Sequence, residues 1–101
     1  MRIIALGPLR EFWKTHCDAE IPLRSWYAQA SRADWRTPAN IKTTYRSASF
    51  IANNRVVFNI KGNDYRLVVA IDYEKGIVWI KWIGTHKDYD KIDVKEVQHD
   101  G

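Results

Sequence analysis

Cysteine is nearly absent from this sequence. Its single cysteine, Cys17, excludes an internal disulfide and a paired-cysteine zinc motif. A chain without disulfides fits a reducing compartment, so we expect a cytoplasmic location. Long apolar runs are missing as well. No stretch approaches the roughly 20 consecutive apolar residues that a membrane span needs, so no membrane partner is expected.

Acidic residues are scarce in the middle of the chain. Between residues 36 and 66, Asp64 is the single acid. Metal-dependent cleavage of a phosphodiester needs clustered carboxylates, so we expect neither a metal nor another cofactor. The positive charge of this segment predicts a polyanion as partner, nucleic acid first, although mild basicity can also serve solubility alone. Six basic residues supply this charge: Arg36, Lys42, Arg46, Arg55, Lys61 and Arg66.

The first half of the chain has the periodicity of helices. After a short strand expected at residues 2–6, Pro8 and Pro22 each stand near the start of a helical pattern, and a short helical turn is expected after Pro38. Each of the two longer patterns has one apolar face, which we expect to be core. The two faces are Leu9, Phe12, Trp13 and His16, and Leu23, Trp26, Tyr27 and Ala30.

The second half has the pattern of strands. We expect strands at residues 48–53, 55–61, 65–73 and 77–84, joined by short turns. Residues 95–101 are expected to be loosely held, with no role for His99. Helices followed by strands predict one α+β domain over residues 1–101, with the N-terminal helices packed on one face of a mostly antiparallel sheet.

Alternation along the strands predicts which side chains face away from the helices. In residues 55–61 one phase is wholly apolar and packs inward, so the basic phase faces outward, and the same argument turns Arg66 outward. In the last strand both phases are apolar, so either could be buried. The predicted outward set, with two residues at its rim, is Arg55, Asn59, Lys61, Arg66, His86 and Tyr89.

This set of side chains suits the cleavage of RNA without a metal. Lysine and arginine can hold a phosphodiester and neutralise its developing charge. Histidine can move a proton near neutral pH, and tyrosine can stack on a base. Each residue also has an ordinary alternative. Arg66 could form a surface ion pair, His86 could cap a turn, and Asn59 and Lys61 could be solvated strand positions.

Two motifs carry a resemblance to a known family. The segments FNIKGNDYRLV (58–68) and GTHKDYD (84–90) resemble those of HigB-type toxins of type II toxin–antitoxin systems, in the RelE-like mRNA interferase superfamily. The resemblance extends over residues 36–93. It implies a RelE-like fold, metal-independent cleavage of mRNA on the ribosome, and neutralisation by a HigA-type helix-turn-helix antitoxin.

The resemblance also implies roles for individual residues. Arg66 and Lys61 would bind the scissile phosphate, His86 would be the acid or base, and Tyr89 would orient or stack on the substrate. Which group is the general base stays open. Two alternatives remain, a non-catalytic RNA- or ribosome-binding module and a protein-interaction domain. The residues expected to bind the rest of the RNA are Asn59, Arg55, Lys87 and Arg46.

Overall fold

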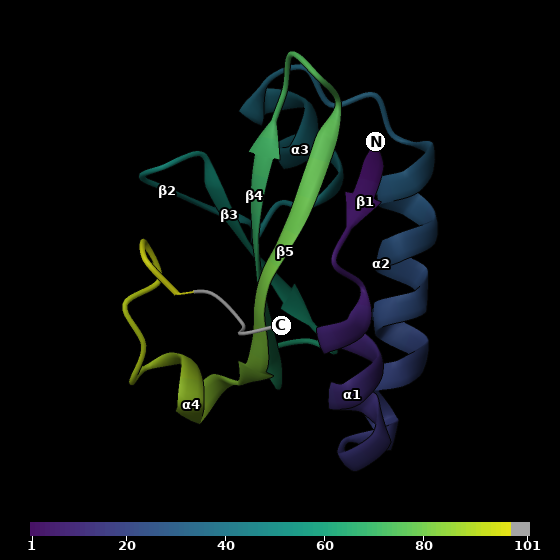
Figure 1. Ribbon diagram of the computed structural model, residues 1–101, viewed down its shortest axis with the longest axis vertical. Coiled ribbons are helices and arrows are strands. Elements are labelled where there is room, and N and C mark those ends of the chain that lie inside the picture. Colours follow the sequence, from purple (N-terminus) through teal and green to yellow (C-terminus); the bar gives the residue numbers. More distant parts are fainter. Residues whose placement is uncertain (98–101) are drawn as a thin grey trace.

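A five-stranded sheet in the order β1-β5-β4-β3-β2 is the framework of the computed structural model, which describes residues 1–97 (Figure 1). Every neighbouring pair of strands is antiparallel except β1 and β5, which are parallel. The mostly antiparallel sheet predicted from the sequence is thereby confirmed. The strands are β1 (Arg2–Ile4), β2 (Ser49–Ile51), β3 (Arg55–Ile60), β4 (Tyr65–Asp72) and β5 (Ile77–Thr85).

The N-terminal helices cover one face of this sheet, as predicted, and Figure 1 shows α1 and α2 side by side there. The short turn expected after Pro38 is α3, and a helix of four residues follows β5 directly. None of the helices within residues 1–97 is both long and apolar enough to cross a lipid bilayer. The helices are α1 (Gly7–Thr15), the 3-10 helix η1 (Cys17–Ala19), α2 (Glu20–Arg32), α3 (Pro38–Thr44) and α4 (His86–Tyr89).

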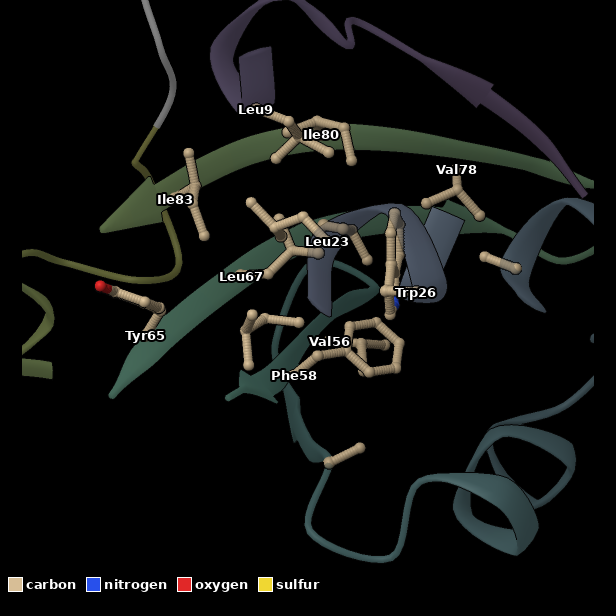
Figure 2. Close-up of a cluster of buried hydrophobic side chains, with 14 of the residues drawn as sticks. Leu9, Leu23, Trp26, Val56, Phe58, Tyr65, Leu67, Val78, Ile80 and Ile83 are labelled. Atoms are coloured by element: carbon tan, nitrogen blue, oxygen red, sulfur yellow. The ribbon is translucent and has the colours of Figure 1, made fainter. Parts of the chain in front are cut away.

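The main core lies between the helices and the sheet. Trp26 of α2 packs against Phe58 of β3, with ring centroids 5.5 Å apart, and Leu9 and Leu23 are buried in the same cluster (Figure 2). Burial of each such side chain stabilises the fold by about 1.5–3 kcal/mol. The expectation that Tyr27 is core is wrong, because its side chain is 40% exposed.

A β-bulge in β5 determines which side chains of this strand face the helices, a question that the alternation of the sequence left open. Val68 pairs with Trp82 and Val69 pairs with Ile80, so Lys81 has no partner in the register. One extra residue shifts the alternation. Ile80 and Ile83 both belong to the helix-side core although they are three residues apart, and Trp82 lies on the opposite face of the sheet.

The C-terminal segment crosses the sheet face that the helices leave open. Arg55 donates hydrogen bonds to the backbone carbonyls of Val94 and Val97, and its side chain is only 8% exposed. The prediction that Arg55 faces solvent is therefore wrong, because a segment distant in sequence covers it and satisfies its donors. Val97 belongs to the tail that we expected to be loosely held, whereas His99 lies outside the described residues.

Candidate functional site

Arg66 and His86 are in contact at one end of the sheet. Arg66 lies in β4, directly between Asn59 of β3 and Gly84 of β5. Its Nη1 donates to the backbone carbonyl of Asn63 at 3.0 Å, and its Nη2 lies 3.1 Å from Nδ1 of His86. A guanidinium can only donate, so Nδ1 accepts this bond and the neutral imidazole carries its proton on Nε2.

Backbone contacts fix His86 in this position. Helix α4 begins immediately after Thr85, whose Oγ1 accepts a hydrogen bond from the backbone N–H of Asp88 at 3.1 Å, as an N-cap does. The backbone N–H of His86 donates to the carbonyl of Asp64 at 3.0 Å. The end of β5 and the turn between β3 and β4 therefore hold the first residue of α4 beside Arg66.

Tyr89, the last residue of α4, completes the cluster. The guanidinium carbon of Arg66 lies 5.8 Å from the centre of the Tyr89 ring, within the range of a cation–π contact. The Tyr89 ring also lies 6.2 Å from that of Trp82. The structure thus brings together three of the four residues for which a catalytic role was predicted: Arg66, His86 and Tyr89.

Within the part of the chain that the structure describes, no carboxylate neutralises the charge of Arg66. Its hydrogen-bond partners are a carbonyl oxygen and a neutral imidazole nitrogen, and among residues 1–97 it forms no ion pair with a carboxylate. The carboxylate of Asp90 faces His86 instead, with Oδ2 3.7 Å from Nε2, and this contact is an ion pair only when the imidazole is protonated. A cation held by neutral groups is available to an anionic ligand.

Lys61 is not part of this cluster. Strand β3 ends at Ile60, and Lys61 lies in the following turn with a left-handed φ of 52°. The strand therefore ends one residue before Lys61, and the alternation that predicted an outward side chain does not apply to it. Its ammonium lies 2.7 Å from a carboxylate oxygen of Asp18 and 3.4 Å from one of Asp64. The prediction that Lys61 shares the outward face with Arg66 is wrong.

Asp18 is the centre of a second, structural cluster on the helix side of the same turn. Its carboxylate also accepts a hydrogen bond from the hydroxyl of Tyr65, which points away from the core in Figure 2. The hydrogen bond from Lys61, and then that from Tyr65, lowers the pKa of Asp18 below its usual value. The hydrogen bond to Asp18 raises the pKa of Lys61 and that of Tyr65. These contacts join η1 to the β3–β4 turn.

The other predicted RNA-binding residues occupy different places. Asn59 is half-buried and lies directly across from Arg66. Lys87 is exposed on α4. Arg46 is exposed before β2, and because Ser49 pairs with Val57, the chain before β2 runs toward the end of the sheet where Asn59 lies. Arg55 stays apart under the C-terminal segment.

Sequence reasoning missed Trp82. The residue lies on the outward face, against Gly84 and beside Tyr89. A tryptophan two residues before a glycine, in the strand that leads into the GTHKDYD motif, was the available signal. The sequence did not predict the face of the sheet on which Trp82 lies, because alternation cannot reveal the β-bulge in β5. Among residues 1–97 no three His, Cys, Asp or Glu side chains lie close enough together to hold a metal ion.

Two comparisons with known proteins concern the family of this chain. Residues 19–92 match the family model described as HigB toxin, the RelE-like toxic component of a toxin–antitoxin system. The chain is also 27% identical over 94 residues to a protein named mRNA interferase HigB from Escherichia coli O6:H1, and the alignment covers 91% of each chain. The matched residues include β3, β4, β5 and α4, which carry the whole Arg66 cluster.

Proposed function

Since the chain belongs to the HigB family of RelE-like toxins, the toxic components of toxin–antitoxin systems, we propose that it cleaves mRNA on the ribosome without a metal ion. The name of its Escherichia coli relative, an mRNA interferase, supports the substrate. The observation that carries the proposal is the Arg66 guanidinium, which has no carboxylate partner among residues 1–97 and contacts His86. Such a pair can bind a phosphodiester and move a proton beside it.

Arg66 binds the scissile phosphate. Its Nη groups donate to the non-bridging oxygens and stabilise the negative charge that grows on them in the transition state. The ribose 2′-oxygen attacks the phosphorus, the bond to the 5′-oxygen breaks, and the products are a 2′,3′-cyclic phosphate and a 5′-hydroxyl. The 2′-hydroxyl loses one proton to a base, and the leaving 5′-oxygen gains one from an acid.

His86 is the acid or base for one of these proton transfers. In the free protein its Nδ1 accepts a hydrogen bond from Arg66. When Arg66 turns its donors to the phosphate, that nitrogen keeps an unused lone pair beside the bound RNA and can take a proton. Tyr89 contacts both Arg66 and Trp82 and orients the nucleotide. Asn59, Lys87 and Arg46 extend the surface that holds the RNA backbone.

The partners follow from the family. A toxin of a toxin–antitoxin system has an antitoxin, and we propose a HigA-type helix-turn-helix protein in this role. The ribosome presents the mRNA, so the protein acts in the cytoplasm. The whole chain serves as one toxin domain.

The proposal is tested with an mRNA bound to ribosomes and cut by the purified protein under single-turnover conditions. We expect cleavage to leave a 5′-hydroxyl and to disappear when a single 2′-deoxynucleotide replaces the nucleotide before the cut. It should persist at EDTA concentrations that leave the ribosomes intact. Cleavage of the 2′-deoxy substrate would contradict attack by the 2′-oxygen. Binding without any cleavage would favour a non-catalytic RNA-binding module.

A further inference from the structure

The indole ring of Trp82 lies over the backbone of Gly84. A side-chain carbon built on Gly84 would lie 2.3 Å from Cη2 and 2.4 Å from Cζ2 of Trp82. The six-membered part of the indole therefore occupies the space in which any other residue at position 84 would place its side chain. Gly84 pairs directly with Arg66 across the β4–β5 ladder. The absence of a side chain at Gly84 thus allows the indole to extend along the strand toward Arg66.

Trp82 and Tyr89 together place aromatic surface beside the Arg66 guanidinium. The two rings are 6.2 Å apart and inclined by 52°, and Arg66 lies 5.8 Å from the Tyr89 ring. Trp82 is half-buried and faces away from the helix-side core. This arrangement offers an aromatic plane next to a cation whose charge no carboxylate within residues 1–97 neutralises.

We infer that Trp82, seated on Gly84, is the surface on which a nucleobase of single-stranded RNA stacks, next to the phosphate that Arg66 binds. This inference rests on the proposed function and names a base-binding subsite for it. A nucleotide carries a planar ring and an anionic phosphate one sugar apart, which matches an indole that lies over Gly84, the residue paired with Arg66. Stacking on an aromatic side chain strengthens binding by about tenfold to about a hundredfold per base and tolerates every base.

Trp79 is the matched control on the same strand. It lies on the same outward face as Trp82, paired with Ala70, and is half-buried in the same way. It lines a hollow with Asn53 and Asn54 instead of Arg66. If the fold simply required tryptophan on this face, substitution at either position would weaken the preference for base-bearing RNA. A base-binding subsite predicts that substitution of Trp82 alone does so.

The test is the binding of a four-nucleotide 2′-O-methyl RNA, which lacks the attacking hydroxyl, to the isolated protein at low salt. A wholly abasic oligonucleotide with the same sugars and phosphates is the reference. We expect the wild type and Trp79→Leu to prefer the base-bearing RNA by about tenfold or more. Trp82→Leu should reduce this preference to about twofold, and Trp82→Phe should keep part of it. Circular dichroism and thermal unfolding check that each variant folds.

Gly84→Ala provides a second variant that leaves the indole in the chain. Its added methyl group must displace the ring, so the preference for base-bearing RNA should fall as it does in Trp82→Phe. If Trp82→Leu does not fold, Gly84→Ala and Trp82→Phe decide the question in the same assay. The inference is overturned if the folded Trp82 variants keep the wild-type preference, or if the wild type itself has none. Failure of the proposed function appears separately, as a wild type that binds RNA but leaves ribosome-bound mRNA uncut.

Discussion

Two cations at one end of the sheet have opposite surroundings. Lys61 is held by the carboxylate of Asp18, in η1 on the side of the helices, and by that of Asp64 in its own turn. Arg66, on the other side of the same turn, is held by a carbonyl oxygen and by the imidazole of His86. The charge of a cation that is paired with carboxylates is already balanced, whereas the charge of a cation with neutral partners is available to an anionic ligand. The sequence alone suggested the same role for both residues.

The turn between β3 and β4 links the two clusters. Lys61 and Tyr65 at its ends bind Asp18, and this anchors the turn to the helical layer. The carbonyls of Asn63 and Asp64 within it point to the other cluster and accept hydrogen bonds from Arg66 and from the backbone of His86. The structural cluster therefore positions the turn on which the proposed active site depends.

His86→Gln should have the largest effect among variants of the cluster partners. Glutamine keeps a donor and an acceptor near Arg66 but cannot transfer a proton near neutral pH. Removal of a positioned acid or base costs about 10²–10⁴ in rate, so single-turnover cleavage of ribosome-bound mRNA should fall by that factor. Asp88→Asn is the control in the same helix, because the side chain of Asp88 is exposed. Equal rates for the two variants would remove His86 from the chemistry.

Tyr89→Phe should have an intermediate effect. The substitution keeps the ring that contacts Arg66 and Trp82 and removes only the hydroxyl. A hydroxyl that orients the nucleotide through one hydrogen bond contributes about 0.5–1.5 kcal/mol, so its removal lowers the cleavage rate by about tenfold at most. Tyr89→Ala removes the ring as well and should cost more in the same single-turnover assay. If Tyr89→Ala cleaves as fast as Tyr89→Phe, the ring does not contribute.

The smallest expected effect concerns stability in acid and belongs to the Lys61 cluster. The bonds from Lys61 and Tyr65 lower the pKa of Asp18 below 3.8. Because the folded-state pKa is the lower one, the stabilisation is present above the unfolded value and is lost as the pH falls through the folded value. Urea unfolding should therefore show a wild type more stable than Asp18→Asn at about pH 5, with the difference shrinking toward about pH 2. A difference that is independent of pH would contradict the ionised carboxylate.

Much of the fold follows from short-range patterns in the sequence. The alternation of apolar and polar residues showed which side chains of β3 and β4 face the helices, and Phe58 and Leu67 are buried as expected. The turns between the strands follow from short local motifs. The resemblance to HigB-type toxins, confirmed by the family match, was carried by two local motifs. Arg66 and His86 lie within those motifs, so the sequence could bring them forward as candidates.

The errors concern contacts between distant parts of the chain and small irregularities of the backbone. Lys61 was misplaced because β3 ends one residue before it and the chain turns with a positive φ. Arg55 was misplaced because the C-terminal segment returns to cover it. Trp82 had no defined direction because one unpaired residue, Lys81, changes the phase of β5. Alternation along a strand cannot reveal a bulge or the segment that packs over it.

A side-by-side measurement of Arg66→Ala and Lys61→Met tests the contrast between the two cations most directly. Both variants lose one positive charge at the same end of the sheet, and both are assayed for single-turnover cleavage of ribosome-bound mRNA and for growth arrest without antitoxin. We expect Arg66→Ala to lose about 10²–10³ in rate and to relieve the arrest while remaining folded. Lys61→Met should stay within about threefold of the wild type, because its charge is already paired with carboxylates and the hydrogen bond from Tyr65 to Asp18 still anchors the turn. Equal losses, or a larger loss for Lys61→Met in a folded protein, would contradict the assignment of the scissile phosphate to Arg66.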